Sequence, residues 1–273
     1  MVNFRKILYR CRISLTGRPK KSTRELSVQN KVILVTGGAK RVGSAICRRL
    51  HARGAKLVVH FRSSNKAAKA LQTELNQQRA NSVALAQADL LDHKQLSGLI
   101  EAAVQHFGQL DGLVNNASSF FATPLGECSS DHWNDLIGSN LRAPLFLSQA
   151  AAPHLRKQQG CIVNIVDIHT ERPLKDYVIY NAAKGGLQSL TRSLAVEMAP
   201  EVRVNGVSPG PILWPEAGKW TNEAERQETI AGTLLKRCGE PDDIAKTVSF
   251  LIADAPYITG QIIAVDGGRS IHL

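Results

Sequence analysis

Short apolar runs alternate with amphipathic stretches along most of the chain, beginning at about residue 30. Runs rich in β-branched residues predict buried strands, and these cover 31–37, 55–61, 82–88, 110–115, 160–166, 202–207 and 261–265. The stretches between them predict helices, over 41–53, 65–79, 95–107, 132–158 and 177–198. Two further helical pieces follow an irregular loop, rich in Pro and Trp, at about 209–222.

The alternation of strands and helices determines the expected fold class. It predicts parallel βαβ units and therefore an α/β protein with a doubly wound parallel sheet of about seven strands, a Rossmann fold. No repeat, low-complexity segment or linker interrupts the chain after about residue 30. We therefore expect a single domain over 30–273 that includes a substrate loop at about 209–235. A basic and flexible N-terminal extension over 1–29 precedes it.

The net charge of +11 is concentrated near the N-terminus. Eight Lys and Arg residues precede the first acidic residue, Glu25, and without them 26 basic residues stand against 23 acidic ones. The body is therefore nearly balanced, and we expect no nucleic-acid partner. The extension is a disordered arm, an amphipathic segment that touches membranes, a transit peptide or a solvated tail with no part in the chemistry.

The spacing of cysteines and histidines argues against disulfides and metal sites. The five cysteines are scattered and form no Cys-x-x-Cys pair, and the eight histidines show no metal-ligand spacing. We expect a metal-free protein of a reducing compartment, the cytoplasm. No apolar run reaches the length of a membrane-spanning helix, so we expect no stable membrane insertion.

A glycine-rich turn joins the first predicted strand to the first predicted helix. It reads Thr36-Gly37-Gly38-Ala39-Lys40-Arg41-Val42-Gly43, with Arg41 where a glycine is usual. Such a turn brings the backbone close to a pyrophosphate, and the N-terminus of the helix supplies N–H donors. The turn therefore indicates a dinucleotide site.

The end of the second predicted strand indicates which dinucleotide binds. A ribose 2′-hydroxyl calls for an acidic residue there, whereas a 2′-phosphate calls for arginine. The sequence His60-Phe61-Arg62-Ser63 contains no acid. Arg41 and Arg62 are candidates to hold one phosphate between two guanidinium groups. We therefore expect NADP(H).

Tyr180 and Lys184 are four residues apart within a predicted helix and therefore share one face of it. A phenol with a pKa near 10 is a poor acid or base at neutral pH. A neighbouring ammonium group lowers the pKa of a phenol. The pair is therefore a compact acid–base device if a hydride carrier lies beside it.

With these motifs in order, the chain resembles the short-chain dehydrogenase/reductase family over about residues 30–268. The matching residues are Thr36, Gly37, Arg41, Gly43, Asp89-Leu90, Asn115-Asn116-Ala117, Asn140, Tyr180, Lys184, Asn205, Pro209-Gly210 and Asp266-Gly267-Gly268. The resemblance implies cofactor contacts from Gly37, Arg41, Val42, His60, Arg62, Ser63, Asp89, Leu90, Asn116, Ala117, Ser118, Tyr180, Lys184, Pro209 and Gly210. It also implies a homotetramer.

In this family Asn140, Tyr180, Lys184 and a serine thirteen residues before the tyrosine form the catalytic group, but here that position holds Asp167. A carboxyl group beside a phenol can raise the pKa of either group and indicates relayed protonation, which suits reduction of a C=N bond. With Arg41, Arg62 and the run Asn116-Ala117-Ser118-Ser119-Phe120, this substitution resembles the pteridine reductase branch, of bacterial type.

That branch implies NADPH-dependent reduction of dihydropterins, and of dihydrofolate as a further candidate substrate. Carried over by position, Phe120 stacks on the pterin and Ser118 contacts both cofactor and substrate. Asp167 and Tyr180 deliver the proton, Tyr177 lies near the substrate, and Lys184 binds the nicotinamide ribose. His169 is interpreted as loop structure. Trp214 and Trp220 either line the substrate pocket or fold the loop onto the body.

Two other functions compete with this hypothesis. A carbonyl reductase of acyl or sugar ketones predicts Ser at position 167, where the chain has Asp167. A non-catalytic NADPH-binding sensor predicts loss of Asn140, Tyr180 or Lys184, and all three are present.

Overall fold

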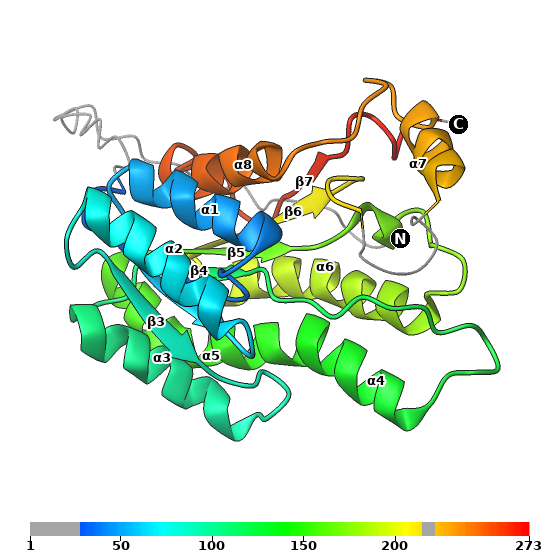
Figure 1. Cartoon of the computed structure of the whole chain (residues 1–273). Helices are drawn as coiled ribbons and strands as arrows, with labels where there is room; N and C mark the ends of the chain where they lie inside the picture. Colours follow the sequence, from blue (N-terminus) through cyan, green and yellow to red (C-terminus); the bar gives the residue numbers. More distant parts are fainter. Residues whose placement is uncertain (1–27, 215–221, 273) are drawn as a thin grey trace, which may run out of the picture.

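The computed structural model describes residues 28–214 and 222–272 (Figure 1). The expected N-terminal extension, except its last two residues, lies outside the described residues, and so does the part of the substrate loop that contains Trp220. In chain order the elements are β1 (Val32–Val35), α1 (Arg41–Ala52), β2 (Lys56–Phe61), α2 (Asn65–Gln78), β3 (Val83–Gln87), α3 (Lys94–Phe107), β4 (Gly112–Asn115), α4 (Ser130–Ile137), η1 (Gly138–Arg142), α5 (Ala143–Gln158), β5 (Cys161–Ile165), η2 (Ile168–Thr170), α6 (Val178–Met198), β6 (Arg203–Pro209), α7 (Glu223–Ala231), α8 (Pro241–Ala253) and β7 (Ile262–Val265).

The seven strands form one parallel sheet in the order β3-β2-β1-β4-β5-β6-β7. This confirms the predicted doubly wound Rossmann fold. The order runs outward in one direction from β1 to β3 and in the other from β4 to β7, so the switch point lies between β1 and β4. In open α/β sheets, ligands bind outside the carboxyl ends of the strands at such a point.

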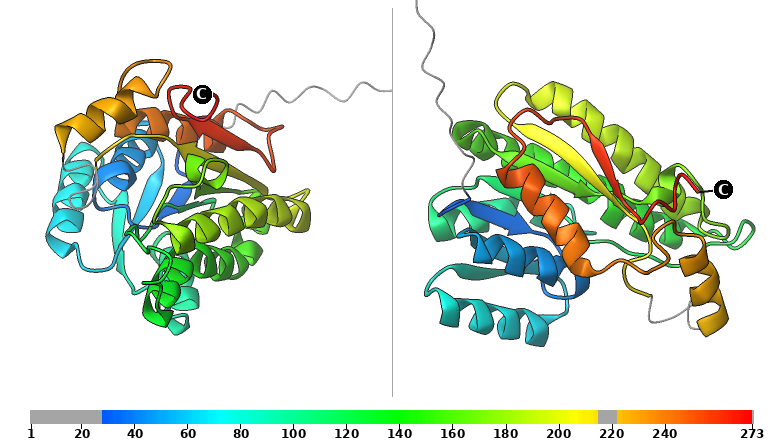
Figure 2. Two further views of the ribbon diagram at one scale, coloured as in Figure 1. Left: turned by 90° about the vertical axis from the view of Figure 1, so that its right-hand side faces the viewer. Right: turned by 90° about the horizontal axis from the view of Figure 1, so that it is seen from above.

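Helices cover both faces of the sheet and bury it in two apolar clusters (Figures 1 and 2). On one face, α8, α1 and α2 lie side by side, and α3, α5 and α6 cover the other. Alternate residues of β1 point to opposite faces: Ile33 and Val35 belong to the first cluster, Val32 and Leu34 to the second. Burial on both faces explains why the strands appear in the sequence as unbroken apolar runs.

The helix predicted over 132–158 is divided in the structure. The segment η1 has π-helical geometry and separates α4 from α5. Such wide turns are frequent at functional sites. Hydrophobic periodicity cannot reveal one, because the segment stays helical on either side. The division of the predicted helix affects a predicted catalytic residue, because η1 contains Asn140.

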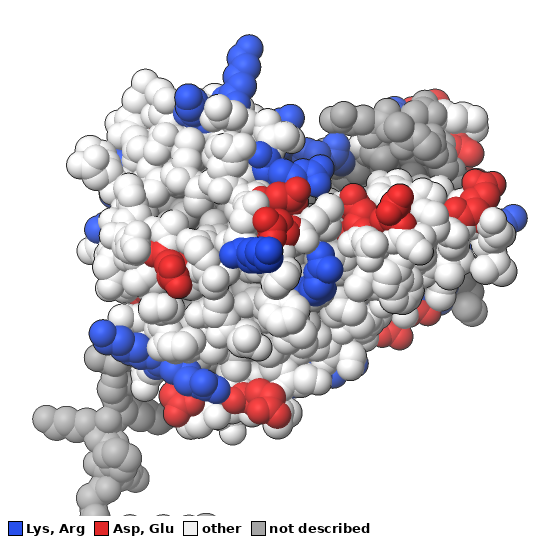
Figure 3. All heavy atoms as spheres, turned by 90° about the horizontal axis from the view of Figure 1, so that it is seen from below, with Lys and Arg blue, Asp and Glu red and all other residues white. Residues whose placement is uncertain are grey.

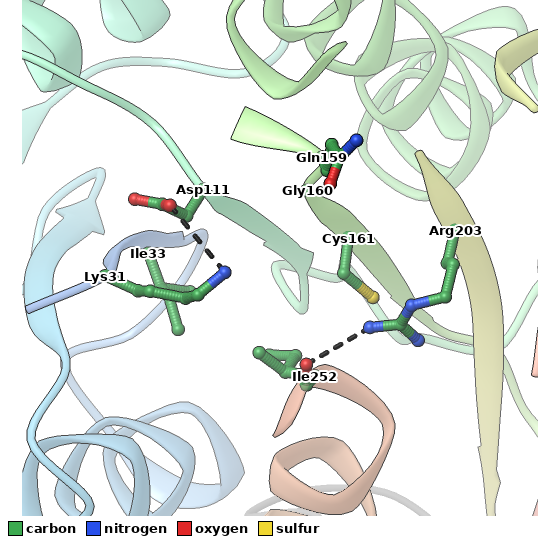
Figure 4. Close-up of a pocket in the computed structure, with 8 residues that line it drawn as sticks. All are labelled: Lys31, Ile33, Asp111, Gln159, Gly160, Cys161, Arg203 and Ile252. Atoms are coloured by element: carbon green, nitrogen blue, oxygen red, sulfur yellow. Dashed lines mark hydrogen bonds and ion pairs between the residues drawn. The ribbon is translucent and has the colours of Figure 1, made fainter. Parts of the chain in front are cut away.

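The amino ends of the central strands are closed. A cavity of about 10 Å³ lies there, lined by residues that include Lys31, Asp111 and Cys161 (Figure 4). Arg203 donates to the carbonyl oxygens of Leu251 and Ile252 at 2.7 and 3.1 Å. A volume of this size holds at most one water molecule. A substrate site therefore has to lie at the opposite end of the sheet.

The surface and the titratable groups add three facts about the described residues. In none of the described helices is there an apolar stretch long enough to cross a membrane. No group of three or more His, Cys, Asp or Glu side chains in the described part is arranged to hold a metal ion. Viewed from the side of α3 and α5, basic and acidic side chains are interspersed, with large uncharged areas between them (Figure 3).

Candidate active site

A cavity of about 770 Å³ opens at the carboxyl ends of the strands and unites most of the predicted site residues. Those that line it are Gly37, Arg41, Val42, His60, Arg62, Asp89, Leu90, Asn116, Ala117, Ser118, Phe120, Asp167, Tyr180, Lys184, Pro209, Gly210 and Trp214. Among the described residues predicted for the site, Ser63, Asn140 and Tyr177 lie outside the lining. The cavity spans both sides of the switch point, and its volume lies within the usual range of small-molecule and cofactor sites.

The turn between β1 and α1 requires its glycines. A Cβ on Gly43 would lie 2.2 Å from the carbonyl oxygen of Gly37, and Gly37 itself has φ +61°. Arg41 also has a left-handed φ of 52°, which explains why glycine is usual at its position. A side chain in this conformation costs roughly 1–2 kcal/mol, and such strain is commonly found at functional sites. The missing side chains thus let the turn pack closely against the loop after β4.

His60, at the end of β2, hydrogen-bonds to this turn. Its Nδ1 accepts from the Gly37 N–H at 3.1 Å, and its Nε2 donates to the carbonyl oxygen of Ala88 at 3.1 Å. This pair of contacts requires the neutral Nε2–H tautomer. Burial lowers the pKa of His60 and favours the same neutral form. The side chain therefore ties the turn to the ends of β2 and β3.

Asn116 supports the turn from the end of β4. Its Nδ2 donates to the carbonyl oxygens of Thr36 and Gly37 at 2.9 and 3.2 Å. Thr36 Oγ1 accepts from the backbone N–H groups of Asn116 and Ala117 at 2.9 and 3.0 Å. The residues on both sides of the switch point are thus fixed to each other before a ligand arrives.

The guanidinium group of Arg41 does not join Arg62 in this structure. Its Nη2 donates to the carbonyl oxygens of Leu213 and Trp214, at 3.3 and 3.2 Å, in the loop after β6. Arg62 follows β2, which β1, β4 and β5 separate from β6. In this structure the Arg41 guanidinium group is therefore held by the loop after β6, and a double fork around one phosphate stays a prediction.

Asp167 and Tyr180 form the chemical centre of the cavity. The Tyr180 hydroxyl donates to Oδ2 of Asp167 at 2.7 Å, and Oδ1 of Asp167 accepts from the His169 N–H at 2.9 Å. Burial, followed by the charge and hydrogen bond of Asp167, raises the pKa of Tyr180 well above its ordinary value. The phenol therefore holds its proton throughout the neutral range.

Lys184 is completely enclosed beneath this pair. Its Nζ donates to the carbonyl oxygen of Ile165 at 2.9 Å and lies 5.7 Å from the centre of the Tyr180 ring. Burial lowers the pKa of Lys184 to about 8, and the negative charge of Asp167 only partly offsets this. The expectation that the pKa of Tyr180 is lowered was wrong, because burial and Asp167 raise it.

Asn140 does not line the cavity, but it hydrogen-bonds to Ser118, which does. Its Nδ2 donates to the carbonyl oxygens of Ser119 and Leu136, both at 3.0 Å. Its Oδ1 accepts from the Ser118 hydroxyl at 2.6 Å. The π-turn at η1 opens the Leu136 carbonyl to the side chain, so Asn140 joins the helix to the loop after β4. In this structure it positions Ser118.

An aromatic wall stands beside the Asp167–Tyr180 pair. The Phe120 ring stacks on Tyr177 with 4.6 Å between centroids and meets Tyr180 edge-on at 4.8 Å. Tyr177 is buried behind this wall and does not line the cavity. Trp214 packs against the same aromatic cluster and also lines the cavity, which is compatible with both of its predicted positions. The wall presents a flat aromatic surface to a ligand.

Several residues of the lining were not predicted from the sequence. Among them are the polar or charged residues Lys40, Thr229 and Arg269. Arg269 follows the Asp266-Gly267-Gly268 run at the end of the last strand, and that position was a usable signal. His169 lines the cavity, and its Nδ1 donates to the carbonyl oxygen of Arg172 at 3.0 Å. It therefore also has the expected role in loop structure.

Comparisons with known proteins agree with this geometry. The family model described as enoyl-(acyl carrier protein) reductase matches residues 37–270. Pteridine reductase 1 of Leishmania tarentolae is 38% identical, over 88% of this chain and 96% of its own length. A 3beta-hydroxysteroid dehydrogenase of Eggerthella lenta is 32% identical, over 90% of this chain and 95% of its own. A metagenomic blue fluorescent protein in complex with NADPH has a TM-score of 0.83 and 35% identity, covering 89% of this chain and 99% of that one.

Proposed function

The chain belongs to the short-chain dehydrogenase/reductase family of oxidoreductases, and from that premise we propose that it reduces pteridines with NADPH. The substrates are dihydropterins and dihydrofolate, and the products are their tetrahydro forms. The observation that carries the proposal is the 2.7 Å hydrogen bond between the Tyr180 hydroxyl and Asp167. A paired phenol and carboxyl group suit a reaction that has to protonate nitrogen.

The lining of the cavity fits NADPH. Gly37 and Gly43 let the turn at the start of α1 pack closely, and the backbone N–H groups of this turn are candidates to bind a pyrophosphate. Lys40, Arg41 and Arg62 all line the cavity, and none of them belongs to an ion pair among the described residues. Unpaired cations of this kind attract phosphate groups. Arg62, at the end of β2, is the candidate for the 2′-phosphate, and Lys184 is the candidate for the nicotinamide ribose.

In the proposed mechanism the protein orients the substrate and delivers a proton. Phe120 stacks on the pterin ring, and Ser118, held by Asn140, contacts cofactor and substrate. The bound cofactor supplies a hydride to the carbon of the C=N bond. Tyr180 and Asp167 bring a proton to the adjacent nitrogen, since the hydrogen bond between them lets a proton pass from one group to the other. The raised pKa of Tyr180 keeps the phenol protonated until it is needed.

A carbonyl reductase is the alternative that the similarity to a hydroxysteroid dehydrogenase favours. Reduction of a ketone places the developing negative charge on oxygen, which a neutral hydroxyl donor stabilises. Asp167 stands where that hydroxyl would be expected. A carboxylate beside such an oxygen repels it, so the geometry favours the pteridine.

We also propose that the protein is a homotetramer of the cytoplasm. Large apolar side chains are exposed on α4, α5 and α6, namely Trp133, Leu145, Phe146, Val178 and Val196. Exposed apolar side chains on adjoining helices mark association surfaces. The uncharged areas on the side of α3 and α5 are consistent with such contacts (Figure 3).

One assay tests the proposed function. NADPH absorbance is followed with dihydrobiopterin, dihydromonapterin, dihydrofolate and a panel of acyl and sugar ketones. We expect turnover of the pteridines and little of the ketones. Turnover of ketones with none of any pteridine overturns the proposal in favour of the carbonyl reductase. Absence of all turnover, with NADPH still bound, favours the sensor.

A further inference from the structure

Arg269 is a half-buried cation on the wall of the cavity that the proposed chemistry leaves without a role. Its Nη1 donates to the carbonyl oxygen of Thr229 at 2.6 Å, which fixes the guanidinium group against α7. No ion pair among the described residues includes Arg269. Asp266, the nearest acid in sequence, instead accepts from the backbone N–H groups of Gly268 and Ser270 at 2.9 and 2.7 Å. Burial lowers the pKa of Arg269, and the negative charges of Glu228 and Asp266 offset this only in part.

The position of Arg269 separates it from Arg62, the candidate for the 2′-phosphate of the cofactor. Arg269 follows β7, whereas Arg62 follows β2. Five inter-strand spacings lie between β2 and β7, about 24 Å at about 4.8 Å each. An anion that reaches Arg269 is therefore not the 2′-phosphate.

The same sheet order places Arg269 within reach of a substrate held at the chemical centre. Asp167 follows β5, and two inter-strand spacings, about 10 Å, separate β5 from β7. Trp214 and Thr229 line the cavity on this side together with Arg269. A substituent on a bound pterin ring therefore runs along this wall toward the guanidinium group. A planar guanidinium group binds a carboxylate through two parallel hydrogen bonds.

We propose that Arg269 binds a carboxylate on the tail of the substrate and so makes the enzyme selective for acidic pteridines of the folate kind. This inference rests on the proposed pteridine reductase function. A pterin with a short hydroxylated side chain has no carboxylate to offer, so its binding gains nothing from Arg269.

The test compares two substrates that share the pteridine ring and differ in the carboxylate. Wild-type protein, Arg269→Met and Arg269→Lys are assayed with dihydrofolate and dihydrobiopterin under saturating NADPH. For Arg269→Met, we expect the ratio of kcat/KM for dihydrofolate to that for dihydrobiopterin to fall by about 10- to 100-fold, the size of a charge-assisted hydrogen bond. The loss is expected in KM. Arg269→Lys should give a ratio between those of Arg269→Met and wild type, because lysine keeps the positive charge but cannot form the two parallel hydrogen bonds of a guanidinium group.

Arg237→Met is the matched control, because it removes a guanidinium group that pairs with Asp243 at 3.2 Å outside the cavity lining. It should leave the ratio within about twofold of wild type, as exposed ion pairs contribute little. An Arg269→Met ratio equal to that of wild type overturns the inference while the proposed function stands. If wild-type protein reduces neither pteridine, the proposed function itself fails. An acyl-coenzyme A is tested in parallel, because its phosphate groups are the other source of an anion. If Arg269→Met reduces it less efficiently than wild type while the dihydrofolate-to-dihydrobiopterin ratio is unchanged, Arg269 binds a phosphate and the inference is overturned.

Discussion

The hydroxyl of Tyr180 lies 2.7 Å from Oδ2 of Asp167, although 13 residues separate the two in the sequence. Asp167 stands just after β5, and Tyr180 lies in the first turn of α6. The second carboxylate oxygen of Asp167 accepts from the His169 backbone, so the carboxylate cannot turn away from the phenol. The fold therefore holds a proton donor and acceptor in one fixed arrangement beside the aromatic wall.

Replacing Asp167 with serine should impair pteridine reduction while leaving cofactor affinity nearly intact. Removing a proton-transferring group typically costs 10²- to 10⁴-fold in rate, and we expect kcat for dihydrobiopterin to fall within that range. The dissociation constant for NADPH, measured by fluorescence titration, should change only a few-fold. Asp176→Asn, which alters an acid outside the cavity lining, is the control. Unchanged activity in Asp167→Ser shows that Asp167 has no role in proton delivery.

Lys184 should make the stability of the protein depend on pH in the alkaline range. Its folded pKa of about 8 lies below the ordinary lysine value of 10.5. Between these values the unfolded chain binds more protons than the folded protein, so the free energy of unfolding rises with pH. Relative to Lys184→Met, which has no such group, wild-type protein should gain up to about 3 kcal/mol from pH 8 to pH 10.5. Urea unfolding of both proteins at several pH values measures the difference. A constant or falling difference contradicts the lowered pKa.

The sheet and much of the cavity could be predicted from the sequence because each depends on local pattern. Strands buried on both faces appear as apolar runs, as in Val32–Val35. The turn after β1 is marked by Gly37 and Gly43. The turn packs so closely that neither position has room for a side chain. Parallel strands bring their carboxyl ends to one edge, so motifs that follow different strands were expected to meet, as Asp167 and Phe120 do.

The remaining features depend on tertiary contacts that no pattern encodes. The carbonyl oxygens that Arg41 binds lie 172 and 173 residues away in the sequence. Whether the Arg41 guanidinium group binds these oxygens or a phosphate depends on the path of the loop after β6. The pKa of Tyr180 rises because the residue is buried, which spacing to Lys184 cannot reveal. Arg269 comes from the last turn of the chain and meets Thr229 of α7 only in the folded protein.

Phe120→Leu should weaken substrate binding. An aromatic pair contributes about 0.5–1.5 kcal/mol beyond the area it buries, so we expect KM for dihydrobiopterin to rise by about 3- to 10-fold. Phe121→Leu is the matched control, because Phe121 contacts His132 edge-on at 5.6 Å and does not line the cavity. Steady-state kinetics of both variants measure the difference. An equal rise in KM for the two variants shows that the substitutions act through the packing of the loop and not through stacking.

Arg62→Asp should change the choice of cofactor. Arg62 lines the cavity at the end of β2 and belongs to no ion pair among the described residues. A 2′-phosphate held by a guanidinium group gains a charge-assisted hydrogen bond of about 1.5–3 kcal/mol, and an aspartate in its place adds repulsion. We therefore expect the NADPH dissociation constant to rise by at least about tenfold while that of NADH changes little, as measured by calorimetry. Lys66→Asp makes the same change of charge at an exposed position of α2 outside the lining, and should leave the preference for NADPH intact. Equal weakening of both cofactors by Arg62→Asp indicates that Arg62 contributes general charge, and an unchanged preference places the phosphate at another cation of the cavity.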